Sequence, residues 1–420
     1  MSFIPTSTQG SKTNQPVISW TQMFSALRNS NFRIYWIGLT VSLIGTWMQT
    51  AATSWMIYRL TNSPLMLGLV NVVYMIPAVP VALFSGVISD RISRKNIVIA
   101  TDIILLIQAL ALGLLTVSGK IQIWSLITLN FILGAASAME QPARLSMIVD
   151  IVGKDDITNA VALSSGVLNF SRILGTAMAG LVLAWKGEAT CFFINSASYM
   201  AAILALLIIH TPDHPRERKQ QKLTKSLMSG LKFVWKSSDI RSLMAIVIVT
   251  TFFSTGYLLL LTVYARDILH AGPTGQGFLL SSVGIGAVIG ALFIANLRSG
   301  NRGKWLLWCN IAGSVLLLAF SISHVLSLSL VLICLVGVFN TVRQTLANSL
   351  LLIITPDEFQ GRVMSIFIIL FNGFSNVGNL AVGGLAEYTG VIEAVGLGAI
   401  LSIFCGILFL IRMKNIRKLA

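Results

Sequence analysis

Residues 86–118, GVISDRISRKNIVIATDIILLIQALALGLLTVS, decide the fold class, because a short charged cluster runs directly into a long apolar stretch. Within residues 97–118 the only charged residue is Asp102. A helix needs about 20 apolar residues to cross the hydrocarbon core of a bilayer. The segment therefore has the length and composition of a membrane-spanning helix that begins just after a basic cluster.

Further segments share this pattern along the whole chain. Of the 420 residues, 55% are hydrophobic and 11% are charged, whereas about a quarter of the residues of soluble domains are charged. No long stretch alternates in polarity as a barrel strand does. The sequence predicts an all-α membrane protein with twelve transmembrane helices in two six-helix bundles, with spans at 33–58, 64–88, 97–118, 121–140, 158–185, 189–209, 241–265, 275–297, 304–323, 326–349, 362–386 and 391–411.

Basic residues are concentrated at one end of these spans. If both termini are cytoplasmic, most of the 30 Lys and Arg residues lie on the cytoplasmic side, and Arg172 and Arg343 lie within helices. Cytoplasmic loops of membrane proteins are enriched in Lys and Arg. Topology therefore explains the net charge of +15, and we expect no nucleic-acid partner. The basic residues on the outer side are Arg59, Lys120, Lys186 and Arg266.

A polar segment near the midpoint divides the chain. Residues 210–240 form a predicted cytoplasmic linker between bundles at 33–209 and 241–411, with tails at 1–32 and 412–420. Leu227, Leu231 and Val234 have helical spacing among lysines, as in a helix on the inner leaflet, although a solvated linker fits equally well. Residues 1–20 lack a secretory-signal pattern. We expect an integral protein of the bacterial inner membrane.

The two bundles are related by an internal repeat. An ungapped alignment pairs Gly134 with Gly337, Gln141 with Gln344, Asn169 with Asn372, Gly175 with Gly378, Gly180 with Gly383 and Gly187 with Gly390. Parallel repeats of this size are typical of transporters whose halves rock around a central site. We interpret Gly175, Gly180, Gly378 and Gly383 as positions of close helix packing, which is compatible with a sliding surface between the halves.

The charged cluster carries a family resemblance. GVISDRISRK resembles the loop signature between helices two and three of the major facilitator superfamily, and Ser93 stands where that signature has glycine. Ion pairs and helix-end contacts of such charges break when the cytoplasmic face opens. We interpret the cluster as a cytoplasmic latch, with simple anchoring as the alternative for its last residue; it consists of Gly86, Asp90, Arg91, Arg94 and Lys95.

Three longer stretches narrow the resemblance. Residues 45–70, 140–152 and 169–180 are similar to the branch of the superfamily that contains the enterobactin exporter and related secretion and efflux proteins. The last, NFSRILGTAMAG, also resembles the antiporter signature of helix five, with Thr176 in place of its proline. The resemblance implies a proton-coupled exporter of a small amphipathic molecule, such as a siderophore or a drug, by alternating access. An importer, a broad multidrug pump or a non-transporting receptor or scaffold stays open.

Arg172 is the first candidate site residue, because it lies near the middle of span 158–185. A charge at that depth is costly and normally faces a cavity or a partner. Our hypothesis is that Arg172 attracts an anionic or catechol-like oxygen of the substrate, or neutralises a proton-carrying carboxylate. A buried structural ion pair is the alternative.

Acidic candidates for proton coupling are few. Asp102 lies within span 97–118 and Glu140 lies at the inner end of span 121–140. For Asp102 we expect a structural pair with Arg91 or Arg94 in preference to a proton site. The repeat places Glu140 opposite Arg343, so we predict that these two form an inner gate that favours the outward-facing state. Independent solvated charges are equally compatible with the sequence.

Polar and aromatic residues of the first and seventh spans complete the candidates. Thr46 and Gln49 offer hydrogen bonds to a largely apolar ligand. Aromatic residues such as Trp47 and Tyr257 lie in the same helices, although packing explains most of them. The chain lacks a phosphate-binding loop, metal-ligand spacing and a catalytic pair. We therefore expect a monomeric transporter without a cofactor, and no enzymatic activity.

Overall fold

The computed structural model describes residues 24–78, 80–81, 92–153, 156–210, 223–295 and 301–412, which are almost entirely helical. The N-terminal half contains the short 3-10 helix η1 (Ser25–Arg28), α2 (Ser30–Thr61), α3 (Pro64–Met75), α5 (Arg94–Val117), α6 (Ile123–Val152), α7 (Ile157–Lys186) and α8 (Glu188–Ile208). The linker helix α9 (Leu223–Lys236) leads to the C-terminal half, which contains α10 (Ser238–Ser254), α11 (Tyr257–Val263), the π-helical turn η2 (Tyr264–Ile268), α12 (Gly272–Ala295), α13 (Arg302–Ser321), α14 (Leu326–Ile354), α15 (Asp357–Thr389) and α16 (Val391–Arg412).

The described helices agree with a twelve-span membrane protein. Ten of them are long and apolar enough to cross a bilayer, when α10, α11 and η2 are counted as one segment, Ser238–Ile268. Two more come from α2, which is 32 residues long, and from α3, a shorter apolar helix. The second half of the predicted span 64–88 lies largely outside the described residues.

Several predicted helix ends were wrong. α6 continues to Val152 and α14 to Ile354, whereas the sequence predicted ends at 140 and 349; α15 begins at Asp357 and not at 362. The predicted spans end at Glu140 and begin at Arg362, both of which are charged. A charge does not end a helix when a partner one turn away neutralises it, and this is the case for Glu140 and Arg144 in α6.

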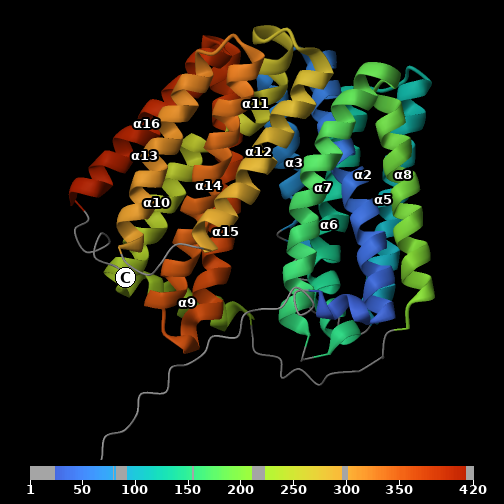
Figure 1. Ribbon diagram of the computed structural model, residues 1–420, viewed down its shortest axis with the longest axis horizontal. Helices are drawn as coiled ribbons and strands as arrows, with labels where there is room; N and C mark the ends of the chain where they lie inside the picture. Colours follow the sequence, from blue (N-terminus) through green and yellow to red (C-terminus); the bar gives the residue numbers. More distant parts are fainter. Residues whose placement is uncertain are drawn as a thin grey trace, which may run out of the picture.

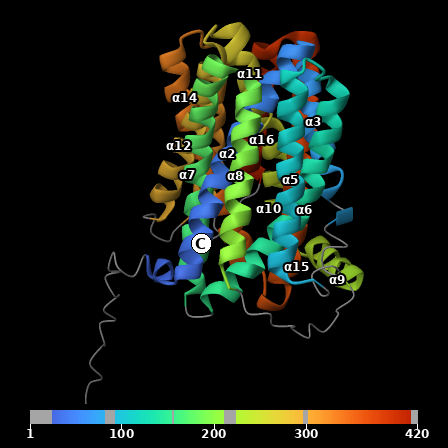
Figure 2. The same ribbon diagram turned by 90° about the vertical axis from the view of Figure 1, so that its right-hand side faces the viewer.

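One end of the bundle, which we call the linker end, collects the beginnings of α2 and α5 and the ends of α6 and α8. Lys95 Nζ donates a hydrogen bond to the carbonyl oxygen of Ile209 over 2.7 Å, and Asn29 Nδ2 donates to that of Ile151 over 2.9 Å. Figures 1 and 2 show α9 at this end and α11 at the opposite end. The two ends are therefore structurally distinct.

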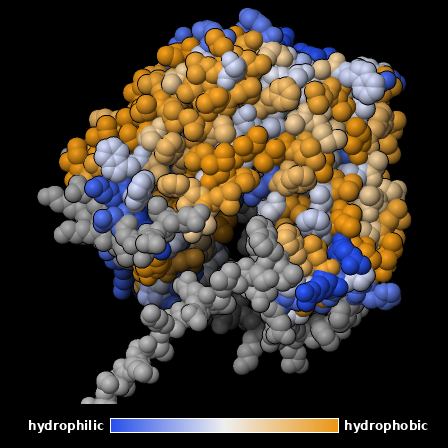
Figure 3. All heavy atoms as spheres, in the orientation of Figure 1, coloured by the Kyte–Doolittle hydropathy of each residue, from blue (hydrophilic) through white to orange (hydrophobic). Residues whose placement is uncertain are grey.

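The two halves touch toward the opposite end and separate at the linker end. Hydrogen bonds between the halves join residues at or beyond the middle of the helices, as between Thr176 and Ser281, whose hydroxyls lie 2.9 Å apart. Ser63 Oγ also donates to Glu387 Oε2 over 2.7 Å. Figure 3 shows a hollow between the halves that faces the linker end. The structure thus describes a bundle that is open at the linker end.

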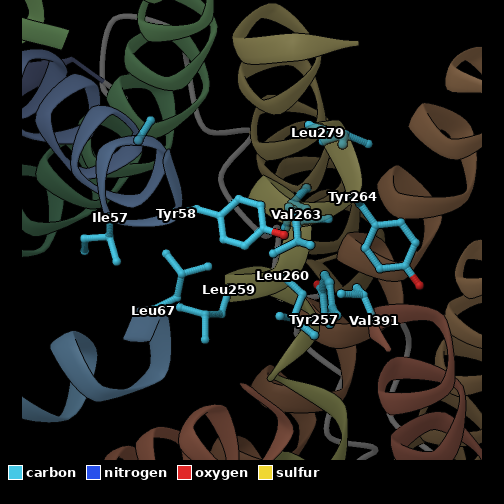
Figure 4. Packing of buried hydrophobic residues seen from close by; sticks show 14 of the residues in the cluster. Ile57, Tyr58, Leu67, Tyr257, Leu259, Leu260, Val263, Tyr264, Leu279 and Val391 are labelled. Carbon is cyan, nitrogen blue, oxygen red and sulfur yellow. The ribbon is translucent and has the colours of Figure 1, made fainter. Parts of the chain in front are cut away.

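A hydrophobic cluster closes the opposite end. Ile57 of α2 and Leu67 of α3 lie in one buried cluster with Leu259, Leu260 and Val263 of α11, as Figure 4 shows. These side chains come from both halves. An apolar constriction of this kind excludes water and polar solutes.

Repeat-related glycines make equivalent contacts in the two halves. Gly134 on α6 lies against a carbonyl group of α3, and Gly337 on α14 lies against a carbonyl group of α12. Gly175 and Gly378 likewise lie against carbonyl groups of α2 and α10. Backbones approach closely at these positions because no Cβ atom separates them. The structure therefore repeats the helix contacts as well as the sequence pattern.

Gly180 and Gly383 differ from the four repeat-related glycines above because their contacts join the two halves. A Cβ atom at Gly180 would lie 3.0 Å from the Cα atom of Gly277 on α12, and one at Gly383 would lie 2.8 Å from the carbonyl oxygen of Pro64. Neither backbone neighbour can move without shifting its helix. Small residues at these positions are thus required for the closed opposite end.

We expect Gly180→Val to weaken closure of the opposite end and to lower transport at least tenfold. The extra side chain would push α7 away from α12. Gly166→Val, on the same helix but with no atom within 4 Å of its Cβ position, should leave transport nearly unchanged. Transport of a fluorescent substrate into vesicles provides the measurement, and equal activity of the two variants would contradict the expectation.

The linker helix α9 is docked on α15 by one face. The rings of Phe233 and Phe359 stack with centroids 4.3 Å apart, and Arg362 Nη1 donates to Ser229 Oγ over 3.0 Å. Val234 is buried, whereas Leu231 is exposed. The predicted apolar stripe is therefore divided between a protein contact and an exposed face; the side chain of Leu227 lies outside the described residues.

Candidate functional site

The N-terminal half contains a cavity of about 590 Å³. Residues of α2, α3, α6 and α7 form most of its wall, together with Tyr199 of α8. The wall is mainly apolar with a few polar groups, which suits a small amphipathic ligand. Its polar and aromatic members include Tyr35, Thr46, Trp47, Gln49, Glu140 and Arg144.

A cluster of three charged side chains lies at this wall. Arg144 forms an ion pair with Glu140, one turn earlier on α6, and its Nη2 lies 3.7 Å from Oδ1 of Asp102 on α5. The side chains of Asp102, Glu140 and Arg144 are 1%, 9% and 17% exposed. With both carboxylates ionised the cluster carries one net negative charge. Uptake of one proton neutralises it, which makes it a chemically suitable proton site.

Of the two partners predicted for Asp102, Arg94 pairs with another residue. Arg94 donates instead to Asp150 over 2.6 Å, and Arg91 lies outside the described residues. Arg144 takes the place of the predicted partner because α6 extends past it. The predicted span 121–140 ends before Arg144, and the position of Arg144 four residues after Glu140 is the signal that could have placed it in the helix.

The neighbours of the cluster are neutral. The hydroxyl group of Tyr35 is buried without a hydrogen-bond partner. The hydroxyl groups of Tyr199 and Thr46 lie 3.1 Å apart. Thr46 thus lines the cavity, as expected for a ligand contact, and also supports an aromatic residue beside the charged cluster.

Gln49 is held in a chain of buried amides. Its side-chain oxygen accepts from Asn195 Nδ2 over 2.8 Å, and its Nε2 donates to Gln108 Oε1 over 2.9 Å. The side chain is 3% exposed. These bonds join α2, α5 and α8. The amide group of Gln49 therefore stabilises the packing of these helices, although part of the residue lines the cavity.

Arg172 lies at the middle of α7, without a carboxylate partner among the described residues. Its guanidinium carbon lies 6.0 Å from the ring centroid of Trp47, and its Nε is buried without a hydrogen-bond partner. Leu168, one turn earlier on the same face, lines the cavity. The alternative of a buried ion pair therefore finds no support in the described chain.

Arg343 occupies a comparable position on α14. Its Nη1 donates to Thr250 Oγ1 over 2.6 Å and its Nη2 to Asn340 Oδ1 over 3.2 Å. Both partners are neutral, and Arg343 is 4% exposed. Glu140 and Arg343 each lie about three turns before the linker end of their helices, so the predicted place of Glu140 at the end of its helix was wrong. They do not contact each other in this conformation.

Only part of the predicted latch can be described. Gly86, Asp90 and Arg91 lie outside the described residues. Arg94, besides its contact with Asp150, donates to the carbonyl oxygen of Ser146 over 3.1 Å, and Lys95 binds the end of α8. These two residues thus connect the start of α5 to the ends of two other helices.

Two carboxylates of the C-terminal half hold the closed end, and our sequence reasoning missed both. Asp267 of η2 accepts a hydrogen bond from the hydroxyl group of Tyr58. Glu387 of α15 accepts from Ser63 Oγ over 2.7 Å and from the backbone nitrogen of Leu65 over 3.3 Å. Both are charges near the ends of predicted spans, where the sequence offers no sign of a partner in the other half.

The family comparison covers nearly the whole chain. The family model described as transmembrane secretion effector matches residues 21–419. The staphyloferrin A transporter of Staphylococcus aureus is 24% identical over 87% of this chain and 92% of its own length. The enterobactin exporter EntS of Shigella flexneri is 23% identical over 95% and 96%, and the multidrug efflux pump Tap of Mycolicibacterium fortuitum is 23% identical over 83% and 87%.

Solved structures share the fold. The nucleoside transporter NupG superposes with a TM-score of 0.74 at 16% identity, covering 92% of this chain and 99% of that one. A bacterial homologue of the lysosomal transporter Spinster, in an inward-facing and occupied conformation, superposes with a TM-score of 0.71 at 12% identity, covering 94% and 98%. At such low identity the likeness concerns the fold alone.

Proposed function

Because the chain belongs to the transmembrane secretion effector family of major facilitator transporters, we propose that it exports a small amphipathic molecule, a siderophore or a drug-like compound, in exchange for protons. The relatives named above are two siderophore transporters and a multidrug pump. They favour export over import. The chain is a membrane transporter and not an enzyme. Its linker end and both of its termini are proposed to face the cytoplasm.

The single observation that carries the proposal is the charged cluster beside the cavity. Asp102, Glu140 and Arg144 lie on two adjacent helices of one half, and two of them line the space that a ligand would enter. A proton on either carboxylate changes the charge of the cluster and weakens its electrostatic attraction to Arg144. Such a change can bias the equilibrium between two conformations, since it alters ion pairs at the wall of the path.

The open linker end supports an alternating-access cycle. The structure resembles a state that accepts substrate from the linker end, and closure of that end would follow a movement of the halves. The predicted inner gate stays a prediction: Glu140 and Arg343, now bound to Arg144 and Thr250, would meet when the linker end closes. A charge swap between them that leaves cysteine labelling from either side unchanged would remove this idea.

Proteoliposomes with an acidic lumen test the proposed function. Protein whose linker end faces outward should accumulate a catecholate chelator, a citrate-based chelator or ethidium, because protons leaving the lumen drive the substrate in. Nigericin, which dissipates the pH gradient, should abolish accumulation. Accumulation that is insensitive to nigericin, or transport of none of the three compounds, would contradict proton-coupled export.

A multidrug pump is the second candidate, supported by the similarity to the pump Tap and by the mainly apolar cavity wall. A deletion strain separates the two. Loss of a secreted iron chelator at unchanged drug sensitivity favours a siderophore exporter, whereas drug sensitivity at unchanged chelator secretion favours the pump.

A further inference from the structure

The charges in the middle of the described helices are unbalanced. Among the described residues, the carboxylates at this depth are Asp102 and Glu140, and both face Arg144. Within the described ranges, neither Arg172 nor Arg343 has a carboxylate partner. A buried guanidinium is costly in lipid unless an anion or a wet cavity compensates it, and neutral partners provide little of that compensation.

Both arginines belong to the same neighbourhood, although they come from different halves. Tyr257 of α11 is buried and lies within electrostatic range of both guanidinium groups. Trp47, beside Arg172, lines the cavity. Arg172 lies one turn after Leu168, which lines the cavity, and its Nε lies 3.6 Å from the position that a Cβ atom at Gly284 of α12 would take.

Each guanidinium still has hydrogen-bonding capacity. The Nε atoms of Arg172 and Arg343 are buried without partners. Arg343 uses two of its donors on Thr250 and Asn340, which are neutral and can be exchanged for a stronger acceptor. Carboxylate and catecholate oxygens bind guanidinium groups with charge-assisted hydrogen bonds, about twice as strong as neutral ones.

We propose that Arg172 and Arg343 form a two-point site for a polyanion between the halves, and that the transported substrate therefore carries two or more acidic oxygen groups. The binding site itself does not depend on the proposed transport function. Only the statement that its ligand is the transported substrate rests on that function. One anionic group binds each half, so an occupied site links the halves across the path. In this conformation the Asp102–Glu140–Arg144 cluster pairs with neither Arg172 nor Arg343, so both remain available to the anion.

Equilibrium binding without any gradient tests the site. The probes are O-octanoyl citrate, an amphipathic tricarboxylate; its trimethyl ester, which has the same skeleton without charge; and tetraphenylphosphonium, an apolar cation. Calorimetry uses the full-length protein in nanodiscs. The wild type should bind the tricarboxylate at least tenfold more tightly than the ester or the cation, because charge-assisted hydrogen bonds to guanidinium groups are about twice as strong as neutral ones.

The variants assign the effect to the two residues. R172Q and R343Q should each weaken tricarboxylate binding at least tenfold and leave ester binding unchanged, whereas R172K and R343K keep the charge and should retain most of the affinity. R241Q is the control, because Arg241 is exposed and donates only to the carbonyl oxygen of Trp235. Unfolding temperatures of all variants identify any that fail to fold.

Three results would overturn the site: no binding of the tricarboxylate, equal binding of its ester, or R343Q with wild-type affinity. If R343Q binds with wild-type affinity but alters cysteine labelling, Arg343 acts in the gate and not in anion binding. Binding that depends on both arginines, in a protein that shows no proton-driven accumulation, would reject the proposed coupling while the site stands. The two proposals can therefore fail separately.

Discussion

Glu140→Gln is expected to abolish proton-driven accumulation while substrate exchange continues. The variant cannot take up a proton at position 140, so the cluster with Asp102 and Arg144 stays fixed at the charge of its protonated state. One proton moving down a gradient of about one pH unit contributes about 1.4 kcal/mol, which corresponds to an accumulation of about tenfold. In proteoliposomes the accumulation ratio should fall from about that value to one.

Glu358→Gln is the matched control for this prediction. Glu358 lies exposed in the first turn of α15, so the same chemical change there should leave accumulation intact. Asp102→Asn should behave like Glu140→Gln if the two carboxylates share the proton. Counterflow of labelled substrate, measured without a gradient, shows that a variant is folded and competent. Full accumulation by the Glu140→Gln variant would remove the cluster from the coupling mechanism.

Asp267→Asn combined with Glu387→Gln is expected to open the closed end. Each carboxylate accepts a hydrogen bond from the other half, Asp267 from Tyr58 and Glu387 from Ser63. A hydrogen bond to a charged group contributes about 1.5–3 kcal/mol and a neutral one about 0.5–1.5 kcal/mol, so converting two such bonds to neutral ones shifts the conformational equilibrium by about tenfold or more. The apolar cluster around Leu67 and Leu259 should retain part of the closure.

Labelling of a cavity residue measures this opening. In a Thr53→Cys background, an impermeant maleimide added at the opposite end should react at least tenfold faster with the double variant, since Thr53 lines the cavity. Glu188→Gln is the control: Glu188 pairs with Arg59 at 2.7 Å, and both belong to the N-terminal half. Equal labelling rates of the double variant and the control would show that the carboxylates do not hold the end closed.

The arginines illustrate which features of the candidate site could be predicted from the sequence. Arg172 was recognisable as a buried charge in a span, and its lack of a carboxylate required the structure. Arg144 was overlooked because a hydropathy reading ends a span at charged residues. Its ion pair with Glu140 allows the helix to continue, and the same error placed Glu140 at a helix end.

The sequence by itself determined the membrane class, the helical architecture and the repeat, because these follow from apolar lengths and spacings along the chain. Tertiary structure decided which charges meet. The contacts of Asp102 with Arg144, of Glu387 with Ser63 and of Asp267 with Tyr58 join helices far apart in sequence. A side chain's partner depends on the rotation and depth of two helices at once, and no single segment contains that information.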